Sequence, residues 1–176
     1  MNIIDLAGPV LVAALPVLSH LLGRFSPADY ENLALQPRRS EHLWQIATFP
    51  LVHVSYSHLI FNVGPLLVLG LLVALNQVST FWLLTAIVLL VSGWGAWLFS
   101  SADRVAGASA LVFGYWGFIL TAAVLQDDAF WTAAAALTLL LYAGLWNSLM
   151  RPGGGISWAS HFWGLLGGVA TALLVS

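Results

Sequence analysis

Four polar side chains interrupt long apolar stretches of this sequence in a pattern that could do chemistry. His58 and Asn62 lie one helical turn apart, and Ser109 and His161 each stand near the start of a later apolar stretch. A serine and a histidine are the minimum for nucleophilic catalysis, because the imidazole takes the hydroxyl proton and returns it to the leaving group. An imidazole and an amide can also donate hydrogen bonds to the oxyanion of a tetrahedral intermediate. These residue types predict acyl-transfer chemistry, provided the fold brings them together.

The composition places these groups in a membrane protein. Of the 176 residues, 60% are apolar and 7% are charged, whereas about 25% are charged in an average globular protein. Five arginines, no lysine and seven acidic residues could not cover the surface of a soluble domain of this size. High hydrophobicity excludes disorder, and a net charge of −2 leaves no basic footprint for nucleic acid. Cysteine is absent, which excludes disulfides and thiol chemistry.

Six apolar stretches are long enough to cross a bilayer. Each has about 20 residues, the helical length that spans a hydrocarbon core of about 30 Å. A β-barrel would need an alternating pattern, which the sequence lacks, so the spans are helices. We therefore predict an all-α membrane protein, a single domain over residues 1–176 folded as a six-transmembrane-helix bundle. The expected spans are 3–23, 57–76, 80–99, 105–125, 129–149 and 156–175.

One long connector runs from Arg24 to about Tyr56. A connector of this length in a compact protein is usually functional or folded in its own right. It mixes charged residues with apolar ones, which favours short helices lying in the membrane interface, with Trp44 as an anchor.

The antiparallel order of six spans brings the candidate residues together. The second, fourth and sixth spans all start on one side of the membrane. Ser109 and His161 each lie about four or five residues into a span, about 6–8 Å below that face. His58 and Asn62 share one helix face at a similar depth. The nearest acid, Asp103, lies in a connector, so we predict a Ser–His dyad rather than a triad.

Each of these residues also has a purely structural interpretation. A single serine in a transmembrane helix usually packs against a neighbour, and a single histidine is usually satisfied by one. Gly107 and the Gly164-x-x-x-Gly168 pair could serve only for close helix approach. If all of these residues were purely structural, however, their gathering at one depth in the membrane would be an accident. The joint pattern favours the functional interpretation.

Four motifs follow one another in a defined order along the chain. They are Trp44, His53-x-x-x-x-His58-x-x-x-Asn62, Gly107-Ala108-Ser109 with Gly114 beyond it, and His161-x-x-Gly164-x-x-x-Gly168. With these motifs the sequence, from about Glu41 to its end, resembles the rhomboid family of intramembrane serine proteases.

The resemblance implies a role for each motif. Ser109 would be the nucleophile and His161 the base, while His58 and Asn62 would help to bind the oxyanion. His53 would hold the long connector, and five further residues would support the site: Gly107, Phe113, Gly164, Gly168 and Trp44. The substrate would be a transmembrane segment of another protein, cut near its membrane end within the lipid bilayer. No cofactor or metal would be needed.

Three positions depart from the family pattern. Ala110 follows Ser109 where the family usually has glycine, Phe113 stands where many members have tyrosine, and Gln45 stands where arginine is common. The methyl group of Ala110 could crowd the nucleophile. It motivates an alternative, a catalytically weak or inactive rhomboid-like protein that binds transmembrane segments. A channel or transporter ranks third, because the sequence shows no inverted-repeat symmetry.

The arginines conflict with the orientation that the resemblance implies. The family places the dyad near the non-cytoplasmic face, here of a bacterial inner membrane, with Met1 and Ser176 on the cytoplasmic side. All five arginines fall in connectors on the dyad side: Arg24, Arg38, Arg39, Arg104 and Arg151. The positive-inside rule alone would place that side in the cytoplasm. We follow the resemblance and expect Arg38 and Arg39 to belong to a folded loop.

Overall fold

The computed structural model describes residues 6–76, 78–150 and 158–176, which fold into helices joined by short connectors. The first three residues of the first expected span, the connector residue Gln77 and the Arg151 connector lie outside this part of the chain. The long helices are α1 (Ala7–Leu22), α4 (Tyr56–Asn76), α5 (Val78–Phe99), α6 (Ser109–Leu125), α7 (Ala129–Met150) and α8 (Trp158–Val175). The prediction of an all-helical protein is confirmed for the described residues.

Three of these helices are long and apolar enough to cross a membrane. They are α4, α5 and α8, while α1, α6 and the Ala129–Gly144 part of α7 are shorter apolar helices. A non-helical dihedral pair at Tyr142 (φ −122°, ψ 25°) interrupts α7 near the end of that apolar part. Helix length and composition therefore identify three clear spans in the described part of the chain.

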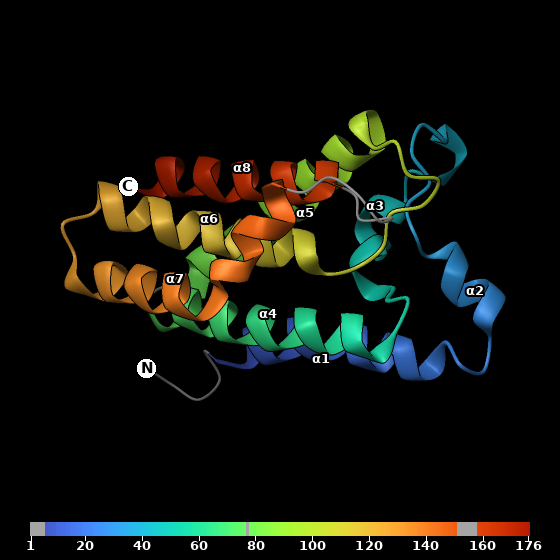
Figure 1. Ribbon diagram of the computed structural model, residues 1–176, viewed down its shortest axis with the longest axis horizontal. Helices are drawn as coiled ribbons and strands as arrows, with labels where there is room; N and C mark the ends of the chain where they lie inside the picture. The colour runs from blue at the N-terminus through green and yellow to red at the C-terminus, as the bar shows by residue number, and fades with distance from the viewer. Residues whose placement is uncertain (1–5, 77, 151–157) are drawn as a thin grey trace.

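Helix α6 lies at the centre of the bundle. It contacts α4, α5, α7 and α8, and its large side chains, such as Phe113, Tyr115 and Phe118, are buried on every side. An apolar surface around the whole helix is typical of a helix that is buried on all sides. Figure 1 shows that α1 begins and α8 ends at one end of the bundle, whereas α6 begins at the other end, beside α3. Ser109, the first residue of α6, therefore lies at the end occupied by the long connector.

Glycines let α6 and α8 approach until their backbones touch. A Cβ atom on Gly164 would collide with the carbonyl oxygen of Ala110, and one on Gly168 would collide with that of Gly114. Gly164 and Gly168 are four residues apart in α8, and Ala110 and Gly114 are four residues apart in α6. The same contact therefore repeats after one helical turn. Small residues at this spacing are the usual means of close packing between helices in membranes.

The segment before α6 is extended, which corrects one predicted boundary. The expected span began at residue 105, but Val105 pairs with Leu35 of the long connector through two backbone hydrogen bonds of 2.8 and 2.9 Å. Gly107 adopts a positive φ of 115° and donates its N–H to the carbonyl of Phe49 at 3.0 Å. These contacts hold residues 105–108 out of the helix. Their apolar composition suits a buried extended segment as well as a helix, so hydropathy alone placed the boundary too early.

The long connector is folded, as its apolar content predicts. It contains the short helices α2 (Pro27–Asn32) and α3 (Gln45–Thr48) and two 3-10 turns, Ser40–His42 and Phe49–Leu51. Trp44 precedes α3 and is 45% exposed, with its ring edge-on to His42. That these elements lie in a membrane interface stays a prediction.

A buried amide holds the connector together. Gln45 is fully buried; its Oε1 accepts the Gln36 N–H at 2.9 Å, and its Nε2 donates to the Asn32 carbonyl at 2.7 Å. The two bonds fix the chain on both sides of Leu35 and thereby the pairing of Leu35 with Val105. Gln45 stands where the rhomboid resemblance leads one to expect arginine, and it anchors the loop through neutral hydrogen bonds instead.

We expect Gly168→Ala to destabilise the protein by about 1–3 kcal/mol, the usual cost of overpacking a tight core. The added methyl must push α8 away from the Gly114 carbonyl. The matched control is Gly64→Ala, because a Cβ atom on Gly64 meets nothing within 4 Å. Alanine favours a helix over glycine by about 1 kcal/mol, so the control should be neutral or stabilising. Thermal unfolding in detergent micelles measures both, and equal melting temperatures would contradict the proposed backbone contact.

Candidate active site

Ser109 and His161 lie within hydrogen-bond distance. The Oγ atom of Ser109 is 2.7 Å from Nε2 of His161. Ser109 begins α6, and His161 lies in the first turn of α8. The prediction placed both residues four or five positions inside their helices, which is wrong for Ser109. The two side chains still meet because the backbones of α6 and α8 touch at Ala110 and Gly164, directly beside them.

The His161 ring is held by an aromatic ring rather than by a carboxylate. Phe113 stacks on it with the ring centroids 4.4 Å apart and an angle of 27° between the planes. His161 is 5% exposed, and its Nδ1 has no hydrogen-bond partner among the described residues. Asp103, the nearest acid in the sequence, is exposed on the α5–α6 connector. In this part of the chain Ser109 and His161 are therefore a hydrogen-bonded pair without a carboxylate partner.

His58 and Asn62 approach the backbone just before Ser109. A Cβ atom on Gly107 would stand 3.1 Å from Nε2 of His58 and 3.8 Å from Nδ2 of Asn62. The absence of a side chain at Gly107 thus lets the His58 ring come close to the backbone, with the Asn62 amide beside it. Asn62 is oriented by donating Nδ2 to the His58 carbonyl at 2.8 Å. The first backbone N–H groups of α6 add donors without partners inside the helix.

His53 connects the long connector to the residue before Ser109. Its Nε2 accepts the N–H of Ala108 at 3.3 Å. Its own backbone N–H donates to the hydroxyl of Tyr30 at 2.7 Å, and the Tyr30 hydroxyl lies 2.9 Å from Nδ1 of His20 in α1. A chain of hydrogen bonds therefore runs from α1 through the connector to the start of α6.

Burial keeps the His53 ring neutral. Its side chain is almost completely buried, and burial, with a smaller contribution from nearby His58, lowers the pKa of His53 from 6.5 to about 4. The ring is therefore uncharged at neutral pH. Because Nε2 accepts a hydrogen bond, the single proton resides on Nδ1. A charged ring would carry protons on both nitrogens and could no longer accept the Ala108 N–H.

The side chain of Ala110 belongs to an apolar cluster beside the start of α6. Ala110 is fully buried in this cluster, which is formed with the connector and α5 and whose other members are Leu35, Ile46, Phe49, Ala96 and Val105. Ala110 thus contributes to the packing that fixes the connector on α6. That its methyl group crowds Ser109 stays a prediction.

Sequence reasoning missed one residue that supports the site. Tyr30 helps to fix the backbone of the long connector and belongs to none of the four motifs. Burial raises the pKa of Tyr30, so its hydroxyl stays protonated. Tyr30 lies in a polar stretch and gave no signal, whereas Gln45 stood out as a departure from the family pattern, although its hydrogen bonds could not be foreseen. Trp44 was expected to support the site, but its ring contact is with His42 in the connector.

Comparison with known proteins finds a family model and several bacterial proteins that are similar to this chain. A family model described as the rhomboid domain matches residues 40–176. Uncharacterized proteins of Mycobacterium tuberculosis and Mycobacterium bovis are each 32% identical over 173 residues, covering 93% of this chain and 72% of the relative. An uncharacterized protein of Mycobacterium leprae is equally similar, with 68% of its length covered.

The neutral His53 predicts a dependence of stability on pH. Its pKa is about 4 in the folded protein and about 6.5 in an unfolded chain. The unfolded state therefore binds more protons below pH 6.5, and folding loses up to about 3 kcal/mol as the pH falls from 6.5 to 4. His53→Gln keeps an acceptor for Ala108 but does not titrate. We expect its melting temperature to fall less than that of the wild type over this range; parallel curves would contradict the assignment.

Proposed function

We propose, because the chain belongs to the rhomboid family, that it is an intramembrane serine endopeptidase that cuts transmembrane segments of other proteins. The observation that carries this proposal is the 2.7 Å distance between Ser109 Oγ and His161 Nε2.

We further propose that residues 1–176 form a single membrane domain of six spans. Helix α6 has only 17 residues, about 26 Å, but it is surrounded by other helices and need not reach both lipid interfaces by itself.

In the proposed reaction Ser109 attacks the scissile carbonyl carbon while His161 acts as general base. With its proton on Nδ1, the His161 ring accepts the hydroxyl proton at Nε2 and later donates it to the leaving amine. A water molecule, activated by the same nitrogen, then hydrolyses the acyl-enzyme. Stacking on Phe113 keeps the ring oriented while its charge changes.

The proposed oxyanion site is the space beside Gly107. His58 Nε2 and Asn62 Nδ2 border it, and the N–H groups that open α6 point toward this end of the helix. Donors that are already in position stabilise developing negative charge more strongly than water does. The hydrogen bond from Ala108 to His53 fixes the backbone on which these N–H groups depend. His53 therefore acts as a positioning residue.

The alternative is a rhomboid-like protein that binds transmembrane segments without cutting them. It rests on Ala110, whose side chain belongs to the apolar connector cluster. A direct assay of Ser109 separates the two functions.

We expect wild-type protein to be labelled at Ser109 by a fluorophosphonate probe and to cut a single-span substrate in proteoliposomes. Ser109→Ala and His161→Ala should each reduce cleavage by at least about 10³-fold, as removal of a nucleophile or its base does in serine proteases. The control is Ser92→Ala, since Ser92 is buried within α5 and should leave cleavage unchanged. Undiminished cleavage by Ser109→Ala would end the proposal, and a folded wild type that is never labelled would favour the binding function.

We also propose that the protein resides in a bacterial inner membrane with the dyad near the non-cytoplasmic face. Three of the five arginines, Arg38, Arg39 and Arg104, line one pocket in folded connectors. Their position can therefore reflect the folding of these connectors and need not report which side of the membrane is cytoplasmic. The opposite end of the bundle, where α8 ends, would then face the cytoplasm. A fluorescent protein fused after Ser176 should fluoresce, and alkaline phosphatase fused there should be inactive. The reverse pair of results would invert the orientation.

A further inference from the structure

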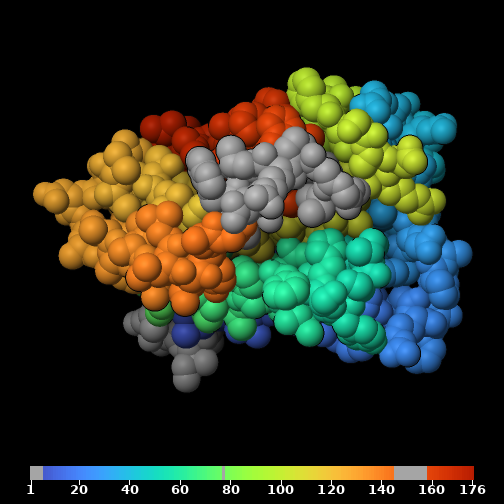
Figure 2. All heavy atoms as spheres, viewed as in Figure 1, coloured from blue at the N-terminus to red at the C-terminus, as the bar shows by residue number. Residues whose placement is uncertain are grey.

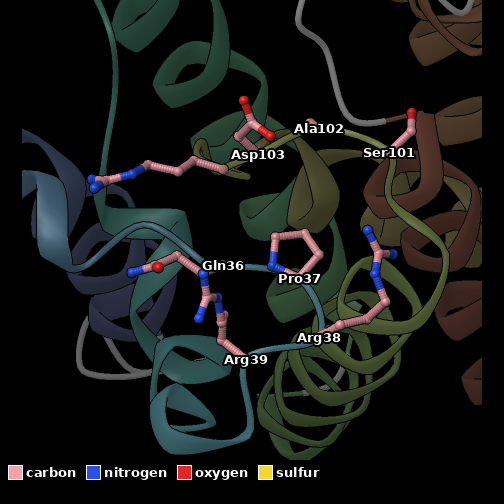
Figure 3. A pocket seen from close by; sticks show the side chains of 8 residues that line it. Gln36, Pro37, Arg38, Arg39, Ser101, Ala102 and Asp103 are labelled. Atoms are coloured by element: carbon pink, nitrogen blue, oxygen red, sulfur yellow. The ribbon is translucent and has the colours of Figure 1, made fainter.

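A polar pocket of about 360 Å³ lies outside the dyad, between the long connector and the α5–α6 connector. Figure 2 shows these two segments, in blue and yellow-green, against each other at one end of the molecule. Arginine side chains dominate its lining: Arg38, Arg39 and Arg104, with Gln36, Ser101 and Asp103 as the other polar members. In Figure 3, Arg38 and Arg39 extend on either side of Pro37, with Ser101 and Asp103 across from them. The pocket concentrates most of the positive charge of a chain that has only five basic residues.

Arg38 is held in place by the end of α5. Its backbone has a positive φ of 61° and donates to the Trp97 carbonyl at 3.2 Å. Its Nη1 donates to the Ser100 carbonyl at 2.7 Å. A left-handed backbone is unfavourable for a non-glycine residue and persists only where its surroundings enforce it. The guanidinium is thus fixed through one nitrogen, and its remaining N–H groups are left for other partners.

The ion pairs of the other two arginines are long and exposed. Arg39 lies 3.6 Å from the Glu41 carboxylate, and Arg104 lies 3.9 Å from the Glu31 carboxylate. Arg104 also donates its Nη1 to the Glu31 carbonyl at 3.0 Å, which leaves its other N–H groups for further partners. All four side chains are largely exposed, and exposed ion pairs of this kind contribute little to stability. An anion with several acceptor oxygens could displace either carboxylate at little cost. A guanidinium binds phosphate oxygens in a two-pronged geometry that suits this exchange.

The pocket adjoins a surface suited to lipid. It lies where α5 ends, and the last turn of α5 exposes the apolar side chains of Leu98 and Phe99. Trp94 and Trp97 pack edge to face there, and the Trp97 indole donates to the Arg39 carbonyl at 3.4 Å. Tryptophan is enriched at the level of lipid headgroups. A phosphate in this pocket could therefore be carried by a lipid whose acyl chains lie along α5.

We propose that the Arg38–Arg39–Arg104 pocket binds the phosphate group of a phospholipid headgroup. Arg38 provides a fixed donor, Arg39 turns from the Glu41 carboxylate to the phosphate, and Arg104 exchanges the Glu31 carboxylate for a phosphate oxygen while its Nη1 keeps the Glu31 carbonyl. Bound lipid would link the long connector to the α5–α6 connector, the two segments that pair through Leu35 and Val105 ahead of Ser109. The site goes beyond the proposed protease activity and does not depend on it.

The test measures lipid binding to the full chain in detergent by native mass spectrometry. The lipid probes are dioleoyl phosphatidylglycerol and a diacylglycerol glycolipid without phosphate. Arg39→Gln and Arg104→Gln are compared with Arg24→Gln, which removes the same charge near the end of α1, where Arg24 donates to the Tyr56 hydroxyl. We expect each pocket variant to weaken phosphatidylglycerol binding by about threefold to tenfold, the loss of one charge-assisted hydrogen bond at an exposed site. Arg24→Gln should leave it unchanged.

A second pair of variants avoids the arginines altogether. Ser101→Glu places a carboxylate in the exposed pocket wall, and Ser101→Gln is its neutral match; only the glutamate should weaken phosphatidylglycerol binding. Melting temperatures confirm that each variant is folded. Displacement of the lipid by millimolar inorganic phosphate would identify a free phosphate ion as the ligand, and resistance to it would identify the lipid-borne group. The proposal is overturned if the glycolipid binds wild type as tightly as phosphatidylglycerol does, or if the pocket variants and Arg24→Gln bind alike.

Discussion

The backbone contact between α6 and α8 is the constraint on which the rest of the structure depends. Gly164 and Gly168 have no side chains, so the two helices approach closely. Carbonyl oxygens of α6 lie where a Cβ atom of α8 would otherwise stand. Ser109 and His161 stand at the end of this contact and are brought together by it. The separation of Ser109 Oγ and His161 Nε2 is therefore fixed by backbone packing, which is stiffer than an arrangement of long side chains.

The long connector is the second constraint, because α6 has to begin at Ser109 and not earlier. The pairing of Leu35 with Val105 and the hydrogen bond from Gly107 to Phe49 end the extended segment just before the serine. His53 accepts the N–H of Ala108 at that point. Residues more than fifty positions apart in sequence thus determine where one helix starts. A connector that looks peripheral in the sequence is structurally part of the candidate site.

Sequence reasoning reached the helical class and the four polar residues because these depend on composition and local spacing. The pairing of Ser109 with His161 could be anticipated from antiparallel order and depth, and the rhomboid motifs gave each residue a prospective role. The start of α6 could not be anticipated, since apolar residues in an extended segment have the hydropathy of a helix. Nor could the functions of Tyr30 and Gln45, because each acts through backbone groups of residues distant along the chain. Pairing of this kind is a property of tertiary structure and leaves no periodic signal.

The scarcity of charge also explains why the candidate site is a dyad. A carboxylate beside His161 would have to lose its hydration among the ends of buried helices, at a cost of several kcal/mol unless fully paired. The described residues use neutral groups at this depth: a hydroxyl, three imidazoles and an amide. Orientation of the base, which a carboxylate provides in a triad, falls instead to stacking on Phe113 and to the rigid α6–α8 contact. In the described part of the chain, charged side chains lie in the connectors, where water and lipid headgroups can solvate them. The same solvation cost that keeps carboxylates away from His161 thus leaves Arg38, Arg39 and Arg104 at the end of the bundle, grouped where an anion can reach them.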